Sequence, residues 1–224
     1  MTILESVESK DGLLSVVQHE NMLALRNGDT GYSCIYTDDN IYQPVYLLVQ
    51  QIIESFAEYH SFNHASILGG GCCTIPRFII KRFGNNIQID SVEYLPSVVE
   101  LTRKYFLQGI KTDHLNLITE DAFQFISNSS KKYDFIFVDL FVRSIWPEEC
   151  KGKRFLTNLS MKTTDYAVIV FNCYHLSNEQ CSDFCQIAEP IIGKSHIIKD
   201  DYGSYYVLFL KRNCNEQCVK KYLL

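Results

Sequence analysis

The spacing of apolar residues changes along the chain and divides it into two parts. Residues 1–42 hold short apolar runs broken by Asp11-Gly12, Gly28 and Gly31, a pattern typical of a small antiparallel meander. After Pro44, residues 45–59 carry apolar side chains at helical spacing, so we expect Pro44 to stand at the start of a helix. The pattern predicts a β-stranded segment over residues 1–42 and a main domain over residues 43–224.

From residue 65 onward, apolar strands alternate with segments of helical period. Helices are expected over 75–83, 96–106, 122–130, 153–162 and 177–192, and strands over 65–70, 87–94, 115–119, 133–140, 166–174, 195–200 and 204–212. Such alternation is typical of parallel strands joined by crossover helices. Asp201-Tyr202-Gly203 is too short for a crossover, so the last strand is expected to run antiparallel in a closing hairpin. The fold class is therefore α/β, a Rossmann-like sheet of seven strands with a small N-terminal antiparallel β appendage.

Polar groups follow the ends of successive strands. Gly69, Gly70 and Gly71 end the first strand of the main domain, and glycines let backbone approach a ligand closely. Glu93 ends the next strand, at the spacing where an acid takes both hydroxyls of a ribose. Asp121 follows the third strand and can accept a hydrogen bond from an exocyclic amine. This order predicts an adenosine-containing ligand.

Each of these residues also has a purely structural interpretation. Glycines often make a turn, Glu93 can be a charge in the first turn of a helix, and Asp121 can be a helix cap. Asp139, at the end of the fourth strand, either positions an amine or sulfonium group or caps a loop. Thr74 stands where G-x-G-x-x-G requires its third glycine, which disfavours a dinucleotide.

Composition and net charge limit the classes of binding partner. The net charge of −5 makes nucleic acid an unlikely partner, and no apolar run is long enough to span a membrane. Nine cysteines form an odd set, and no signal-peptide pattern opens the chain, so we expect a cytoplasmic protein with reduced thiols. The remaining partner class is a small-molecule substrate.

Several cysteines and one tryptophan have alternative interpretations. The pairs Cys181/Cys185 and Cys214/Cys218 share C-x-x-x-C spacing, but zinc sites prefer C-x-x-C, so buried free thiols are expected and no metal is predicted.

Cys72-Cys73 lacks a nearby histidine, which disfavours a catalytic thiol, although the start of a helix can make a thiol reactive. Trp146 either lines a substrate pocket or packs in the core, and Asn172 is interpreted as a satisfied loop amide.

Four segments together resemble the core of a known family. ILGGGCCTIPRFIIKRF, IDSVEYLPSVVELTRKYF, LITEDAFQFI and YDFIFVDLF are similar to the spermidine synthase group within the class I S-adenosylmethionine-dependent methyltransferase superfamily. The short strands of residues 1–42 likewise resemble the N-terminal β-domain of polyamine synthases. The resemblance implies a ribose-binding acid at Glu93 and an adenine-binding pair at Asp121-Ala122. We expect a catalytic role for Asp139, and cofactor contacts from Gly69, Gly70, Gly71, Cys72, Glu93, Tyr94, Asp121, Ala122 and Asp139.

The chain departs from this family at three places. Polyamine synthases carry an aspartate after the glycine triplet and a second one three residues beyond the first in the fourth-strand motif, where it activates the attacking amine. Cys72 and Val142 stand at these positions, and Tyr42-Gln43-Pro44 replaces Tyr-His-Glu. Without an anion at Val142, a polyamine ammonium has neither a charge partner nor a base.

These features lead to a ranked set of functions. The first is a spermidine synthase-like transferase that binds S-adenosylmethionine and moves a methyl group to an unidentified substrate, chemistry that depends mostly on positioning. The alternatives are a polyamine aminopropyltransferase that uses decarboxylated S-adenosylmethionine and a non-catalytic cofactor-binding homologue. An NAD-dependent oxidoreductase ranks last because of Thr74 and the terminal hairpin. The N-terminal strands can pair across a homodimer.

Overall fold

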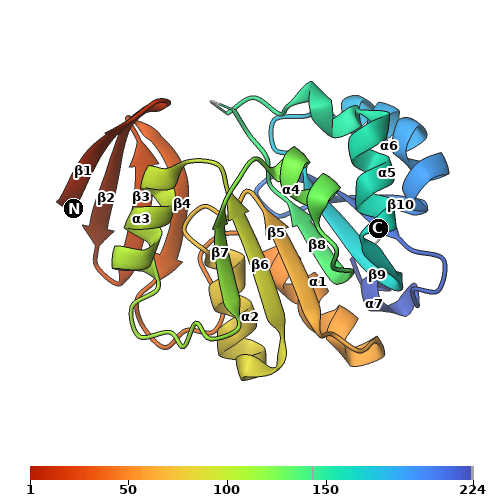
Figure 1. Cartoon of the computed structure of the whole chain (residues 1–224), viewed down its shortest axis with the longest axis horizontal. Coiled ribbons are helices and arrows are strands. Elements are labelled where there is room, and N and C mark those ends of the chain that lie inside the picture. The colour runs from red at the N-terminus through yellow and green to blue at the C-terminus, as the bar shows by residue number, and fades with distance from the viewer. Residues whose placement is uncertain (143, 223–224) are drawn as a thin grey trace.

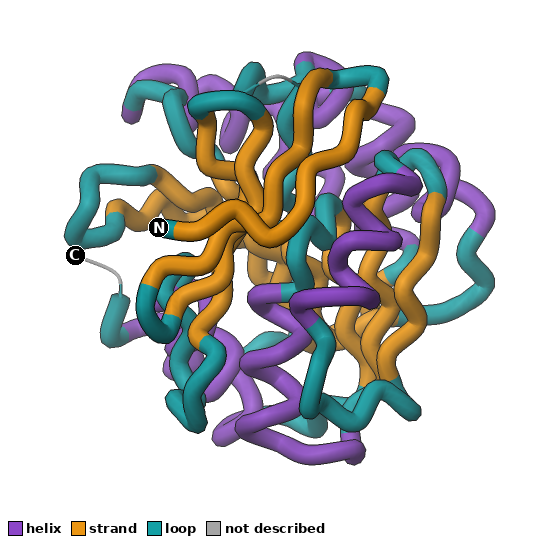
Figure 2. The backbone as a smooth tube through the Cα atoms, turned by 90° about the vertical axis from the view of Figure 1, so that its left-hand side faces the viewer, coloured by secondary structure: helices purple, strands orange, loops and turns teal. Residues whose placement is uncertain are grey.

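The N-terminal strands form a sheet of their own. The computed structural model describes residues 1–142 and 144–222 (Figure 1). Each strand of this sheet pairs antiparallel with the next, in the order β1 (Thr2–Ser9), β2 (Gly12–His19), β3 (Met22–Asn27) and β4 (Thr30–Tyr36). The meander expected from the short apolar runs is thus confirmed. Figure 2 shows this sheet at the front of the molecule, and the domain boundary at residue 42 stays a prediction.

The main sheet has seven strands in the order β10-β11-β9-β8-β5-β6-β7. The five strands from β9 to β7 pair in parallel, whereas β11 is antiparallel to both β9 and β10. This confirms the predicted closing hairpin. The strands are β5 (His64–Leu68), β6 (Gln88–Glu93), β7 (Leu115–Thr119), β8 (Tyr133–Val138), β9 (Thr163–Asn172), β10 (Lys194–Lys199) and β11 (Tyr205–Leu210).

Helices cover both faces of the main sheet. Side chains alternate across each strand, so Phe135 and Phe137 of β8 join one apolar cluster and Ile136 and Val138 join the other. The first cluster includes α1 (Leu47–Tyr59), α2 (Thr74–Phe83) and α7 (Gln217–Lys220), and the second includes α4 (Ala122–Asn128), α5 (Lys153–Met161) and α6 (Asn178–Ile192). Helix α6 begins with a capping box between Ser177 and Gln180.

Helix α3 (Pro96–Leu101) has a different partner. Its Val98 and Leu101 pack with Leu14 and Leu25 of the N-terminal sheet. Figure 1 shows this helix beside the N-terminal strands. The helical segment then continues as a π-helical turn, η2 (Thr102–Phe106), closed by a 3.1 Å bond from the Leu107 N–H to the Thr102 carbonyl. The helix expected over 96–106 is therefore confirmed in extent, but residues 102–106 form a wider π-helical turn in place of regular α-helix.

The first helix also begins later than the sequence predicts. Helix α1 starts at Leu47, and Tyr46 before it adopts a left-handed φ of 61°. The Gln50 side chain accepts a 2.8 Å hydrogen bond from the Gln43 N–H and donates a 2.7 Å bond to the Val45 carbonyl. These bonds hold the segment around Pro44 in a turn, so this proline precedes the helix and does not open it.

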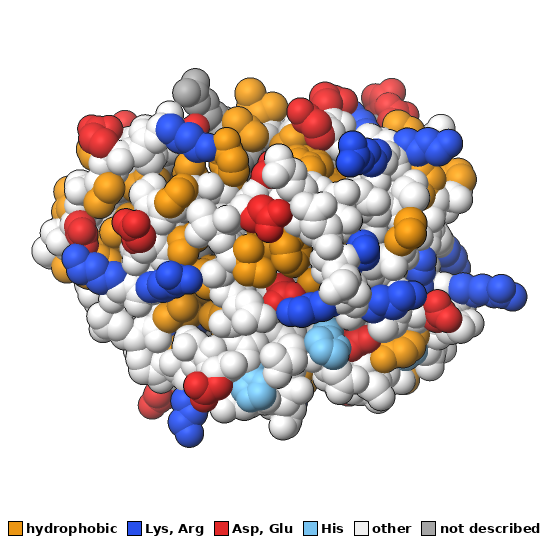
Figure 3. Space-filling model, in the orientation of Figure 1, with side chains coloured by type: hydrophobic (Ala, Val, Ile, Leu, Met, Phe, Trp, Pro, Cys, Tyr) orange, Lys and Arg blue, Asp and Glu red, His pale blue; other side chains and the backbone are white. Residues whose placement is uncertain are grey.

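The described residues also include two short 3-10 turns, η1 (Gly84–Asn86) and η3 (Glu148–Lys151), the latter between the strand expected to end at 140 and the helix expected to begin at 153. Acidic and basic side chains are interspersed on the face shown in Figure 3. Among the described residues, no helix is both long enough and apolar enough to cross a membrane.

Candidate functional site

The glycine turn brings the ends of β5, β6 and β8 together. Gly69 has a φ of +88°, and a Cβ there would lie 2.1 Å from the Asp139 carbonyl oxygen. A Cβ on Gly70 would lie 2.2 Å from the Ser91 hydroxyl. The Gly69 and Gly70 N–H groups both donate to the Val92 carbonyl, at 2.9 and 2.8 Å. Glycine is thus required for close packing of strand ends, and this packing sets the β6 and β8 termini side by side.

Glu93 is buried at the end of β6, with 4% of its surface exposed. Its carboxylate accepts backbone hydrogen bonds from Gly71 at 3.1 Å and Leu95 at 3.0 Å. Burial raises the pKa of Glu93, and these N–H donors oppose that rise. The side chain therefore joins the glycine turn to the start of α3, instead of merely adding charge to a helix terminus.

Tyr32 of the N-terminal sheet reaches the same carboxylate. Its hydroxyl lies 3.3 Å from both Glu93 oxygens, a longer contact than the two backbone bonds. The carboxylate offers about four lone-pair positions, of which two are held by backbone donors. The other lone pairs of the Glu93 carboxylate make only the long contact with the Tyr32 hydroxyl. They can therefore accept hydrogen bonds from the two hydroxyls of a ribose.

Asp121 and Ala122 follow β7. The Asp121 Oδ1 atom accepts a 2.9 Å hydrogen bond from the Gln124 N–H, so the residue is the N-cap of α4. Ala122 is 6% exposed and belongs to the apolar cluster under that helix. The Glu120 N–H donates to the Glu93 carbonyl at 3.2 Å, which links this strand end to Glu93. The helix-cap interpretation of Asp121 holds, and an adenine contact stays a prediction.

Asp139 follows β8 at the same edge. Its Oδ1 accepts a 2.7 Å hydrogen bond from the Asn172 amide, and Tyr46 also hydrogen-bonds its carboxyl group. Burial raises the pKa of Asp139 to about 6, and the negative charge of Glu93 adds to this rise. The two acids therefore form one electrostatically linked, anionic edge.

Three residues that sequence reasoning missed or ranked low help to build this site. Tyr32 lies in the meander, and the left-handed φ that places Tyr46 beside Asp139 leaves no pattern in the sequence. The sequence favours a satisfied loop amide for Asn172; its side-chain Oδ1 does accept from the Tyr174 N–H, but its side-chain nitrogen also donates to Asp139. The only available signal was its place at the end of β9.

Cys72 and Cys73 are both fully buried. Cys72 packs in the apolar cluster between the N-terminal sheet and α3, so its side chain faces away from solvent. Burial raises the pKa of the Cys72 thiol well above its ordinary value and that of Cys73 to about 12. The interpretation of one of these cysteines as a reactive thiol at the start of α2 is therefore wrong, because neither sulfur ionises near neutral pH.

The remaining candidates lie around this edge. Tyr94 is 54% exposed, with the Lys10 ammonium 3.1 Å from its ring centre. Trp146 is buried and donates a 3.0 Å hydrogen bond to the Asn172 carbonyl, so it packs in the core and does not line a pocket. Val142 is 59% exposed and forms a β-bridge with Ile145.

The two C-x-x-x-C pairs do not come together among the described residues. Cys181 of α6 hydrogen-bonds Cys173, whereas Cys214 and Cys218 adjoin His60. A four-cysteine metal site is therefore excluded for this part of the chain. All nine cysteines carry free thiols.

Solved structures share this fold. A probable spermidine synthase from Corynebacterium glutamicum ATCC 13032 is 15% identical, with a TM-score of 0.80 over 94% of this chain and 81% of that chain. Spermidine synthase from Thermotoga maritima is 10% identical, with a TM-score of 0.70 over 98% and 75% of the two chains. Human methyltransferase-like protein 13, solved in complex with SAH, is 15% identical, with a TM-score of 0.62 over 77% and 84%.

At these identities the structural likeness shows the fold, a Rossmann-like methyltransferase architecture. A search of curated protein sequences gives no significant match. The family model described as the spermine/spermidine synthase domain, however, matches residues 50–194, which is more than half of the chain and includes the glycine turn, Glu93, Asp121, Asp139 and Asn172. The chain therefore belongs to the spermine/spermidine synthase domain family.

Proposed function

We propose that the chain binds an adenosyl sulfonium compound at the edge formed by the glycine turn, Glu93, Asp121 and Asp139. In this arrangement Glu93 takes the ribose hydroxyls in place of the Tyr32 phenol. Asp121 and the backbone after β7 receive the adenine ring. Family membership and the buried, backbone-anchored carboxylate of Glu93 support this placement.

We further propose aminopropyl transfer from decarboxylated S-adenosylmethionine as the reaction. One observation carries this choice: the edge holds two linked carboxylates, and the Asp139 carboxylate is costly to bury without a cation. Decarboxylated S-adenosylmethionine offers a sulfonium and an ammonium without the carboxylate of S-adenosylmethionine, so it complements this edge better. The spermidine synthase neighbours favour the same choice over the methyl transfer ranked first from sequence.

In the proposed reaction, an amine nitrogen attacks the propyl carbon bonded to sulfur. The carbon–sulfur bond breaks, methylthioadenosine leaves with the electron pair, and the nitrogen loses a proton to solvent. Asp139, held by Asn172 and Tyr46, orients the ammonium of the donor. The glycine turn and Glu93 fix the nucleoside, so the chain supplies mostly positioning.

Methyl transfer from S-adenosylmethionine is the second candidate, and the side chains at two positions favour it. Cys72 is buried in an apolar cluster, and Val142 places no carboxylate at the acceptor side. A methyl acceptor that needs no deprotonation tolerates both residues. This candidate shares the nucleoside site and differs only in donor and acceptor.

Calorimetry and product analysis together test these proposals. We expect decarboxylated S-adenosylmethionine and methylthioadenosine to bind more tightly than S-adenosylmethionine, and NAD not to bind. Incubation with a panel of linear diamines should then release methylthioadenosine. Formation of S-adenosylhomocysteine would instead support methyl transfer, and binding of none of these nucleosides would overturn the site.

A further inference from the structure

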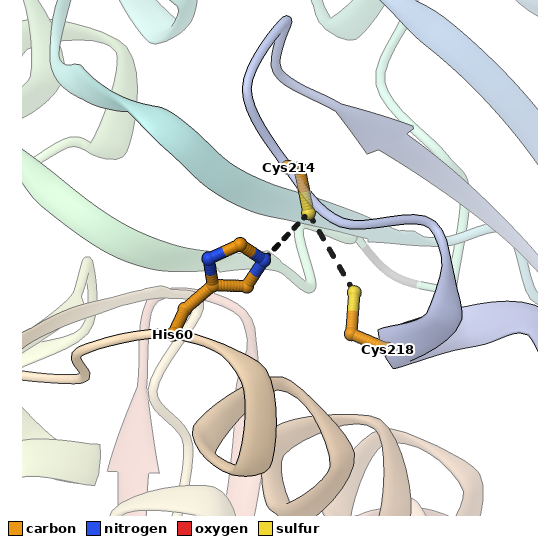
Figure 4. A group of neighbouring side chains, drawn as sticks. All are labelled: His60, Cys214 and Cys218. Atoms are coloured by element: carbon orange, nitrogen blue, oxygen red, sulfur yellow. Dashed lines mark hydrogen bonds between the residues drawn. The ribbon is translucent and has the colours of Figure 1, made fainter.

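Three side chains that bind transition metals meet at the end of the sheet opposite to Asp139. His60 follows α1 and precedes β5, while Cys214 and Cys218 flank the start of α7 (Figure 4). The Cys214 sulfur lies 3.6 Å from the Cys218 sulfur and 3.7 Å from the His60 Nε2 atom. All three potential ligand atoms lie within 4.8 Å of one another. Residues 154 positions apart in the chain thus form one compact cluster.

These separations match the edges of a tetrahedral zinc site. With zinc–sulfur bonds of about 2.3 Å and zinc–nitrogen bonds of about 2.0 Å, tetrahedral angles place two sulfurs about 3.8 Å apart and a sulfur and a nitrogen about 3.5 Å apart. The two distances from the Cys214 sulfur agree with these values to within about 0.2 Å. The third separation, between the Cys218 sulfur and the His60 Nε2 atom, is at most 4.8 Å, so a small shift of the side chains encloses an ion.

The histidine is held in the orientation and tautomer that a metal requires. Its Nε2 atom accepts a 2.9 Å hydrogen bond from the Asn215 N–H, so this nitrogen carries a lone pair, and the Cys214 sulfur lies 3.7 Å from the same atom. The ring stacks on Phe56 and Tyr166, with centroids 5.1 and 5.3 Å away. A metal ion takes the place of the Asn215 hydrogen bond and uses the same lone pair.

We propose that His60, Cys214 and Cys218 bind one zinc ion that fastens the C-terminal helix α7 to α1. The two thiols release their protons to solvent on binding, and the resulting thiolates neutralise the charge of the ion. A water molecule completes the fourth position. The Tyr222 hydroxyl, which donates a 2.8 Å hydrogen bond to the Gln51 carbonyl, already ties the same tail to α1, so the ion strengthens an existing contact.

The test uses the full-length protein, reduced and stripped of metal with a chelator. Calorimetric titration with Zn²⁺ should show one equivalent, and Co²⁺ should give the absorption of a tetrahedral thiolate site. Because loss of an outer-shell partner already costs about 10- to 100-fold in affinity, His60→Ala, Cys214→Ser and Cys218→Ser should each lose at least about 100-fold. Thermal unfolding with and without Zn²⁺ should show a rise in Tm for the wild type and none for these three variants.

Two control variants keep the comparison matched. Cys185→Ser removes the second cysteine of the other C-x-x-x-C pair, and His64→Ala removes an exposed histidine. Both should bind Zn²⁺ and gain Tm as the wild type does. Absence of stoichiometric binding in the reduced wild type, or binding that survives in His60→Ala, would overturn the proposal.

Discussion

Val142→Asp supplies a carboxylate where the proposed aminopropyl transfer lacks a general base. The Val142 side chain is 59% exposed, and its backbone N–H and carbonyl pair with Ile145 at 2.9 Å in both directions. An aspartate there displaces no packed side chain, keeps both backbone bonds and stays ionised near neutral pH. We expect the stability to change by no more than about 0.5 kcal/mol.

The size of the expected gain follows from the exposure of this position. A general base contributes about 10²- to 10⁴-fold, which is about 2.7–5.5 kcal/mol of transition-state stabilisation. Because position 142 is well exposed, solvent screens the new charge, and we expect the lower end, about 10²-fold. The wild type should turn over putrescine and decarboxylated S-adenosylmethionine well below an ordinary rate of about 1–10 per second.

The assay follows methylthioadenosine release from these two substrates at saturating concentrations. Val142→Asn is the matched control, since it has nearly the shape of aspartate but cannot accept a proton at neutral pH. Ile145→Asp places the same charge on the bridge partner, whose side chain is 70% exposed. Equal rates for Val142→Asp and Val142→Asn, or an ordinary rate for the wild type, would refute the argument.

Three further predictions concern the acids and the phenol at the strand edge. Glu93→Gln should weaken methylthioadenosine binding at least about tenfold in calorimetry, about 1.4 kcal/mol, because a charged acceptor of hydroxyls is lost, while exposed Glu100→Gln should bind normally. Tyr32→Phe should leave that affinity unchanged or raise it by up to about tenfold, since it removes a competing hydroxyl, and a clear loss would show that Tyr32 contacts the ligand. Burial raises the pKa of Asp139 from 3.8 to about 6, so this side chain favours the folded state below about pH 4, and that contribution is lost as the pH rises through 6. In urea unfolding, Asp139→Asn should therefore gain stability relative to the wild type between pH 4 and pH 7, by at most about 3 kcal/mol, and a constant difference would contradict the raised pKa.

The sequence by itself determined the order of elements and the edge of the sheet at which we propose the nucleoside site. Apolar spacing separates strands from helices because a strand repeats every two residues and a helix every 3.6. The short connection at Asp201 to Gly203 settled the direction of β11. Glu93, Asp121 and Asp139 could be placed together because parallel strands bring their carboxyl ends to one edge.

Only the tertiary structure decided which side chains complete that edge. Tyr32 reaches Glu93 across 61 residues, and Asn172 reaches Asp139 across 33, contacts that no local period encodes. The later start of α1 depends on the Gln50 side chain, which bonds backbone groups of the preceding segment. At the π-helical turn in residues 102–106, the Thr102 hydroxyl donates to the Gly71 carbonyl and the Arg77 guanidinium donates to the Phe106 carbonyl, contacts between segments far apart in the chain. The contact between His60 and Cys214 likewise depends on tertiary structure, because it arises from the packing of α7 on α1 in the folded core. The spacing of these residues along the chain does not predict it.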